Sequence, residues 1–189
     1  MSKESLKEKK STWAKSLFIG LFCAFVFKPV GIFAQDVVDS TPDRIVVTTD
    51  IDSTVDEVWQ VMIDFQNYDT WNTWYRLEGE AKEGATVKAY GESGGHLDLQ
   101  ITKMGQNTVC WTDVSWFTHF GLGGWRCRSV APNPDGSGVK FTNHFEYSGP
   151  LRFILEYSTS KTVLDGMTLE NQNLKSFVEK NQNMETTSR

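Results

Sequence analysis

Apolar and polar residues alternate along much of the chain, which is the pattern of half-buried β-strands. Arg44–Ile51 alternates in this way and is rich in β-branched residues. Between Trp74 and Tyr147, turn-forming segments such as ESGG and NPDGSG separate further alternating runs. The pattern predicts six more strands: Tyr75–Ala81, Thr86–Gly91, His96–Met104, Thr108–Val114, Gly124–Ala131 and Val139–Tyr147. Short turns between consecutive strands predict an antiparallel sheet.

Two other segments have apolar residues at three- and four-residue steps, which is the spacing of one helix face. The first helix is predicted to begin at Ser53 as its N-cap, with Asp56 three residues later. Its apolar face is Val55, Val58, Trp59, Met62 and Phe65. The ring-rich stretch DFQNYDTWNTW, Asp64–Trp74, follows as a second short helix or a turn.

The second helical segment runs from Pro150 to about Lys180, with Gly166 as a candidate kink. Its predicted apolar stripe is Ile154, Tyr157, Leu164, Met167, Leu174 and Phe177 or Val178. Residues 35–43 are predicted to be a linker, and residues 181–189 a polar tail. The fold class is therefore α+β: a seven-stranded antiparallel sheet, with two short helices after its first strand, covered by a long C-terminal helix.

The first 34 residues have the features of an export signal. A lysine-rich start precedes an apolar run, Ser16–Phe27, and Ala34 offers a small residue for cleavage. Either a cleaved signal peptide or an uncleaved membrane anchor fits, because Ser16–Ala34 as a whole would reach across a bilayer. We expect an exported protein in the periplasm or cell envelope, of bacterial origin. Only the N-terminal segment, if it is not cleaved, would then contact the membrane.

Removing this leader makes the chain strongly acidic. Subtracting its six lysines and two glutamates from the 19 basic and 24 acidic residues leaves 13 and 22, a net charge of −9. An acidic domain repels a phosphate backbone, so we expect no nucleic-acid partner. No protein partner can be named from the sequence.

Strand alternation also assigns faces and a register. Pairing Cys110 with Cys127 sets Thr112 opposite Trp125, with the loop FTHF closing the hairpin. This register also pairs Val114 with Gly123, and Trp116 with Gly121. In an exported protein the two cysteines form either a disulfide or two buried free thiols.

The face carrying more rings and branched aliphatic residues is predicted to point inward, with a few polar groups to orient a ligand. The predicted ligand-binding residues are Leu99, Thr112, Val114, Trp116, Trp125, Ser129, Phe141, Asn143, Phe145 and Tyr147. The opposite face would carry Asp113, Arg126 and Arg128 as solvated ion pairs. Such a face composition also suits a plain packed core.

One stretch resembles the N-terminal signature of the START-like superfamily, also called SRPBCC or polyketide cyclase/dehydrase-like. The matching residues in VDEVWQVMIDFQNYDTWNTW are Val58-Trp59, Asp64, Tyr68 and Trp71-Asn72, with Thr73 where the family usually has Pro. GEAKEGATVKAY is similar to the next hairpin of the family, and NLKSFVEK to the end of its last helix. The resemblance covers about residues 44–180.

This resemblance implies a helix-grip fold, in which the sheet wraps around the long helix and leaves an apolar cavity. Members bind lipids, sterols or polyketides, and some are enzymes. The rings of the stretch Asp64–Trp74 would pack the short helices against one end of the sheet. Tyr68 and Trp71 are then anchors with polar edges at the solvent rim.

Other candidate chemistry is weak. His96 and His144 are predicted to point outward and His119 to lie in a loop, so no metal site is expected. The glycine clusters GLGG and SGG have no helix directly after them, which argues against a phosphate loop. No cofactor is predicted. The ring-rich loop SWFTHFGLGG gates a cavity, contacts a partner or simply packs.

Two functions from different classes remain. The first is a non-catalytic module that binds an apolar small molecule or lipid between sheet and helix. The second is an enzyme of the cyclase/dehydrase kind, which would need an ionisable group facing the cavity. A third alternative is a protein-interaction domain that uses the same groove.

Overall fold

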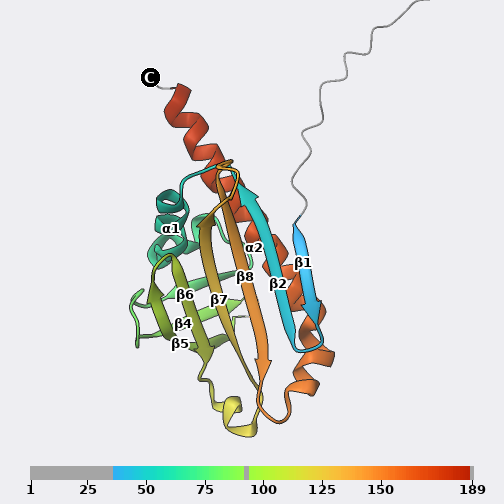
Figure 1. The fold of residues 1–189 in the computed structure, drawn as a ribbon. Coiled ribbons are helices and arrows are strands. Elements are labelled where there is room, and N and C mark those ends of the chain that lie inside the picture. Colours follow the sequence, from blue (N-terminus) through green and yellow to red (C-terminus); the bar gives the residue numbers. More distant parts are fainter. Residues whose placement is uncertain (1–35, 92–93, 188–189) are drawn as a thin grey trace, which may run out of the picture. The chain divides into compact units, whose positions relative to one another are not determined.

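The computed structural model describes residues 36–91 and 94–187, which form an antiparallel sheet around a long helix (Figure 1). The predicted leader, residues 1–34, lies outside the described residues. The sheet has the strand order β1-β2-β8-β7-β6-β5-β4-β3. Its strands are β1 Val37–Thr41, β2 Arg44–Ile51, β3 Tyr75–Glu78, β4 Thr86–Gly91, β5 His96–Gly105, β6 Thr108–Asp113, β7 Gly123–Pro132 and β8 Val139–Ser148. The helices are α1 Val55–Ile63, the 3₁₀ helices η1 Phe65–Thr70 and η2 Trp116–Phe120, and α2 Arg152–Thr187.

The sheet has one strand more than the seven predicted. The segment taken as a linker contains β1, whose five residues pair with β2 in antiparallel register, from Val37 with Thr48 to Thr41 with Arg44. Two valines and a threonine favour the extended backbone, and a tight turn returns the chain to β2. The predicted linker is therefore wrong over these residues.

Helix α1 begins one residue later than predicted. Thr54, not Ser53, is the N-cap: its hydroxyl accepts from the Glu57 backbone N–H, and the Glu57 carboxylate accepts from the Thr54 backbone N–H. This reciprocal pair is a full capping box. Ser53 contributes from outside the helix, because its hydroxyl also donates to the Glu57 carboxylate. Val58 and Met62 are buried, as the predicted apolar face requires.

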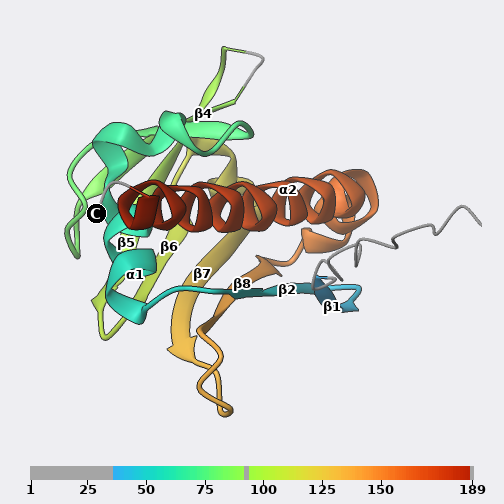
Figure 2. The same ribbon diagram turned by 90° about the horizontal axis from the view of Figure 1, so that it is seen from above.

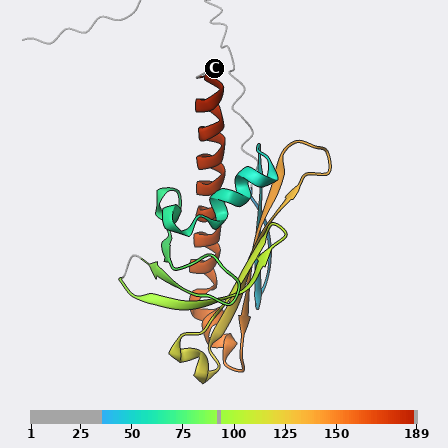
Figure 3. The same ribbon diagram turned by 90° about the vertical axis from the view of Figure 1, so that its left-hand side faces the viewer.

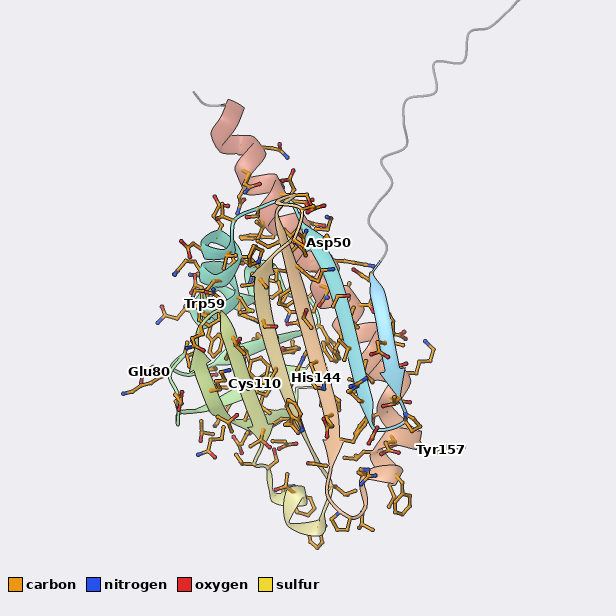
Figure 4. The ribbon with its side chains drawn as sticks, in the orientation of Figure 1. Asp50, Trp59, Glu80, Cys110, His144 and Tyr157 are labelled. Carbon is orange, nitrogen blue, oxygen red and sulfur yellow. A yellow bond between two sulfur atoms is a disulfide. The ribbon has the colours of Figure 1, made fainter. Side chains whose placement is uncertain are left out.

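The sheet curves around α2, as Figure 2 shows. The helix continues past the ends of the strands (Figure 3), and it includes most of the segment predicted to be a polar tail. Among its residues, Met167, Leu174 and Val178 are buried, as predicted. Ile154 and Tyr157 are exposed instead, and Tyr157 points away from the sheet in Figure 4. None of the helices in residues 36–91 and 94–187 is long and apolar enough to cross a membrane.

Gly166 does not break α2, which continues through it. A side chain there would meet the ring of Trp74, because a Cβ atom built on Gly166 lies 2.1 Å from that ring. The glycine therefore serves packing, because it lets the Trp74 indole approach the helix closely. The predicted kink is wrong for this reason.

The β6–β7 hairpin has the predicted register but the opposite face orientation. Cys110 pairs with Cys127 and Thr112 with Trp125, and the two cysteines form a disulfide with a Cα–Cα distance of 4.1 Å. These residues lie on the outer face of the sheet, where Cys110 and His144 are labelled in Figure 4, and the Trp125 and His144 rings are 4.7 Å apart.

The inner face of the hairpin instead carries two arginines. Arg126 is 6% exposed and Arg128 is fully buried, so the solvated ion pairs predicted for them are absent. The pairing with β8 confirms that both arginines face inward, since Arg126 pairs with Phe145 and Arg128 with Asn143. Assigning faces by polarity failed here because a buried acid on α2 compensates the arginines.

The predicted four-residue loop after β6 is also wrong. Ser115 ends the pairing by capping, since its hydroxyl accepts from the Asp98 backbone N–H and its own N–H donates to the Asp113 carboxylate. The following residues form η2, and Gly123 pairs with Ser148 of β8 in place of Val114. Trp116 and Phe120 of η2 are exposed.

Candidate functional site

A cavity of about 560 Å³ lies between the first half of α2 and the inner face of the sheet. This volume falls in the range of small-molecule sites in proteins. It is lined by Trp74, Tyr75, Ala89, Gly91, Gly95, His96, Leu97, Leu99, Trp111, Asp113, Gly123, Gly124, Trp125, Arg126, Phe145, Tyr147, Leu155, Thr159, Thr162 and Val163. Five of these residues, Trp74, Tyr75, Trp111, Phe145 and Tyr147, carry aromatic rings on the inner side, so the wall is mainly apolar.

One glycine, Gly124, shapes this wall. A Cβ atom on Gly124 would lie 2.6 Å from the Phe145 ring, so only glycine lets that ring cross the strand at this point. Phe145 then packs edge-on to Tyr147, with ring centroids 4.8 Å apart. The Tyr147 hydroxyl is satisfied by the Thr159 hydroxyl at 3.0 Å, so it links β8 to α2 at the cavity wall.

A buried charge cluster adjoins the cavity, and two of its residues, Tyr75 and Arg126, line the wall. Glu170 of α2 is fully buried, and its two carboxylate oxygens pair with different arginines. Its Oε2 accepts from Nη2 of Arg126, and its Oε1 lies 2.9 Å from Nη2 of Arg128. We call these three residues, with Tyr68, Tyr75 and Asn143, the charge cluster.

The tyrosines complete the coordination of the acid. The Tyr68 hydroxyl donates to Glu170 Oε1 at 2.6 Å, and the Tyr75 hydroxyl lies 3.4 Å from the same oxygen. Tyr75 in turn accepts from Nη1 of Arg126 at 3.1 Å and from Nη2 of Arg128. Burial raises the pKa of both tyrosines, so each remains a protonated donor at neutral pH.

Asparagines connect this cluster to the sheet. The Asn143 side chain accepts from Nε of Arg126 at 2.8 Å and donates to Glu170 and to Asn171. Asn171 donates to the Val47 carbonyl and the Thr49 hydroxyl of β2. The network therefore joins α2 to strands β2, β7 and β8.

The charges of the cluster do not cancel. Burial alone would raise the pKa of Glu170, but the two arginines outweigh it and hold the pKa below its usual value, so the acid is ionised. Burial alone would lower the pKa of Arg128, but Glu170 together with Tyr68 and Tyr75 outweighs it, so the pKa is raised. Two guanidinium groups thus share one carboxylate. Within the described part of the chain, Glu170 is the only acid that pairs with either arginine.

Sequence reasoning missed this cluster, although a signal for it exists. The stripe on α2 runs from Met167 to Leu174, and the helical steps between them fall on Glu170 and Asn171. Polar residues at two consecutive core positions of a helix require buried partners. Arg126 and Arg128, two residues apart on a strand, are the partners that the alternation could have offered.

The predicted ligand-binding residues are divided between several places. Leu99, Phe145 and Tyr147 line the cavity; Trp125 also belongs to its lining, although its ring packs against His144 on the outer face. Phe141 is in the packed apolar core and Asn143 in the charge cluster. Thr112 and Ser129 lie on the outer face, in register with Trp125 and Thr142, and Val114 and Trp116 lie in the exposed connection after β6.

Tyr68 and Trp71 are buried anchors of η1, as the sequence predicts for their rings, and their centroids are 4.6 Å apart. The polar edge of Tyr68 does not meet water as expected, because it donates to Glu170. The tyrosine therefore ties the short helix to the charge cluster as well as to the core.

Titratable groups also lie near the mouth of the cavity. Asp113, predicted to be outward, lines the cavity, and so does His96, which lies 3.7 Å from Asp98. His144 is on the outer face as predicted. No group of three or more His, Cys, Asp or Glu side chains in residues 36–91 and 94–187 is arranged to hold a metal ion.

Solved structures share this architecture. Protein MLL2253 from Mesorhizobium loti matches with a TM-score of 0.58 at 15% identity, over 72% of this chain and 97% of that chain. A norcoclaurine synthase from Thalictrum flavum, in complex with a transition-state analogue, matches with a TM-score of 0.57 at 12% identity, over 78% and 98%. The chain has the helix-grip fold.

A third helix-grip structure, a protein from Rhodobacter sphaeroides, matches with a TM-score of 0.60 at 9% identity, over 77% of this chain and 98% of that chain. No protein-family model and no curated protein matches the sequence. At these identities the likeness concerns the helix-grip fold, as the sequence resemblance predicted, and the chemistry of the cavity has to be argued from its own residues.

Proposed function

We propose that this protein is an exported carrier or receptor that binds an apolar small molecule or lipid in the cavity between α2 and the sheet. The observation that carries the proposal is the cavity of about 560 Å³ with its wall of aromatic and aliphatic side chains. Burying such a ligand removes apolar surface from water on both partners, which is the main source of affinity for sites of this kind.

Export is part of the same proposal. The Cys110–Cys127 disulfide supports it, because disulfides persist in oxidising compartments and are rare in the reducing cytosol. The lysine-rich and apolar leader predicted from the sequence supports it independently.

The cavity can be tested with N-phenyl-1-naphthylamine, a neutral dye whose fluorescence rises in apolar surroundings. The full chain is expressed with its leader and purified without detergent in the form that the cell yields. We expect saturable binding, and a loss of at least about tenfold in Val163→Trp, because an indole at this lining position would occupy the cavity.

Lys161→Trp is the matched control, since it adds the same indole at an exposed position two residues earlier on α2. It should bind the dye like the wild type. Failure of the wild-type protein to bind, or equal binding by Val163→Trp, would contradict the proposal.

Catalysis is a second candidate function, favoured by one observation. Asp113 and Tyr75 both line the cavity, which supplies the inward ionisable group that an enzyme of the cyclase/dehydrase kind needs. Asp113 would accept a proton, and Tyr75 would donate a hydrogen bond to a substrate oxygen. Chemical conversion of a bound ligand, seen by mass spectrometry and lost in Asp113→Asn, would favour this function over simple binding.

A further inference from the structure

The charge cluster has one more positive charge than negative. Arg126 and Arg128 each remain protonated, while Glu170 supplies a single carboxylate. A buried charge without a partner is strongly unfavourable, so proteins normally balance such charges. The described residues supply no second acid to this cluster, which leaves a place for an anion from elsewhere.

Arg126 is the member of the pair that the cavity reaches. It lines the cavity, whereas Arg128 is enclosed behind it, under the rings of Trp111 and Tyr68. The guanidinium carbon of Arg126 lies 5.2 Å from the Trp74 ring centroid and 5.8 Å from that of Tyr75, both of which also line the cavity. The positive charge is therefore presented to an apolar space.

Hydrogen-bond capacity agrees with the charge count. A guanidinium has five N–H donors, and Arg126 uses one on Nε for Asn143, one on Nη1 for Tyr75 and one on Nη2 for Glu170. This leaves two N–H donors without a partner among the described residues. In addition, Nε and Nη1 of Arg128 are buried without an acceptor there. Each unmet donor of this kind costs free energy.

We propose that the natural ligand is a monocarboxylate amphiphile, whose apolar body fills the cavity and whose carboxylate pairs with Arg126. This inference rests on the proposed binding function and names the class of its ligand. Guanidinium and carboxylate groups match geometrically, since two parallel N–H donors meet two oxygens. One carboxylate brings the cluster to zero net charge.

The same count disfavours other headgroups. A phosphate monoester would bring about two negative charges, which exceeds the excess of one, and the Asp113 carboxylate shares the cavity wall. An ammonium headgroup would add to the excess positive charge. A neutral hydroxyl would accept a hydrogen bond but leave the charge unbalanced.

The test is displacement of N-phenyl-1-naphthylamine from the full chain at pH 8 by three probes with the same tail: dodecanoate, dodecan-1-ol and dodecylamine. Dodecanoate should displace the dye at concentrations about 10- to 100-fold lower than dodecan-1-ol, the range expected for a charge-assisted hydrogen-bonded pair. Dodecylamine should be the weakest.

Arg126→Met should abolish this preference, so that dodecanoate and dodecan-1-ol displace the dye at concentrations within about threefold of each other. The variant retains Arg128 and Glu170 as a balanced pair, which favours folding. Arg76→Met is the matched control, because it removes the same charge from an exposed arginine and should keep the preference. Arg126→Lys, which keeps the charge but not the fork, should retain part of it.

The outcomes separate the two proposals. If the dye does not bind, the proposed function fails and the ligand class fails with it. If the dye binds and wild-type protein is displaced equally by dodecanoate and dodecan-1-ol, the cavity stands but the carboxylate is wrong. The same conclusion follows if Arg126→Met keeps the preference. The wild-type comparison needs no variant, so it decides even if Arg126→Met does not fold.

Discussion

Glu170 is the acid at the centre of the buried charge cluster. It pairs with two arginines and accepts from Tyr68 and Asn143 while being inaccessible to water. Removing its charge in Glu170→Gln leaves two buried guanidinium groups facing each other. We expect a loss of about 3–5 kcal/mol in the free energy of unfolding, measured by denaturant titration.

Asp165→Asn on the same helix is the control for Glu170→Gln. Asp165 is an exposed acid paired with Lys161, so its loss should change the free energy of unfolding by less than about 0.5 kcal/mol. Similar effects of the two substitutions would mean that Glu170 is not the acid that balances the arginines.

Gly166 offers a second test at the scale of a residue. Alanine is the better helix former by about 1 kcal/mol, yet Gly166→Ala should destabilise the protein by about 1–3 kcal/mol, because its methyl group would meet the Trp74 ring. Thermal and denaturant unfolding would measure this. In a Trp74→Leu background the same change should cost less, and equal costs in both backgrounds would exclude the clash.

At the scale of elements, the sequence predicts strands well because alternation and turn residues are local signals. β2 and β4 begin and end where predicted, and the register of Cys110 with Cys127 holds. Which face of β7 points inward is not a local signal. Trp125 and Cys127 have the more apolar side chains, but Arg126 and Arg128 are buried because Glu170, some 40 residues later, compensates them.

The residues of the candidate site also divide into those with a local sequence signal and those without one. Phe145 and Tyr147 were predicted at the cavity because β8 carries its apolar residues in strict alternation. Trp74, Arg126 and Val163 were missed because their positions depend on how three elements meet. Gly166 and the buried Glu170 on α2 determine how these elements pack. Neither residue can be recognised from the spacing of apolar residues.

The β6–β7 hairpin carries a prediction of its own. The disulfide closes the chain between Cys110 and Cys127 into a loop. Its removal should lower the free energy of unfolding by about 2–4 kcal/mol, because the unfolded chain gains conformational freedom. We expect reduction with dithiothreitol to lower the free energy of unfolding by this amount in the wild type. The bond lies on the outer face, so binding of N-phenyl-1-naphthylamine should persist in the reduced protein.

Cys110→Ala combined with Cys127→Ala is the control for that experiment. The double variant should already have the lower stability, and dithiothreitol should not change it further. A reductant effect of equal size in the double variant would show that the disulfide is not its cause.

At the scale of the whole molecule, the buried apolar residues form two clusters. One, around Met62, Trp71 and Leu174, is a packed core that includes α1 and η1. The other, around Ile45, Val47 and Met167, borders the cavity. Residues of both clusters line the cavity, among them Leu99 and Trp111 of the first and Tyr147 of the second. The part of the first cluster that packs α1 and η1 can hold the fold while the cavity exchanges its ligand, which suits a binding protein.

The ends of the fold are joined by an acid whose titration can be followed in the unfolding of the whole molecule. Glu57 accepts from Ser53 and Thr54, and Gln182 near the end of α2 donates to it, so its pKa falls from 4.5 to about 2. Because the folded-state pKa is the lower one, the unfolded state binds the proton first. Stability from Glu57 is therefore present above about pH 4.5 and is lost as the pH falls towards 2.

Glu57→Gln keeps a capping side chain but removes this titration. We expect the variant to be less stable than the wild type at pH 7, and the difference between them to shrink progressively from pH 4.5 to pH 2, measured by urea unfolding at each pH. Asp56→Asn, a change at an exposed acid in the same turn, controls for the general effect of removing a negative charge. A difference between Glu57→Gln and wild type that stays constant with pH would show that the carboxylate does not link α1 to α2 through its charge.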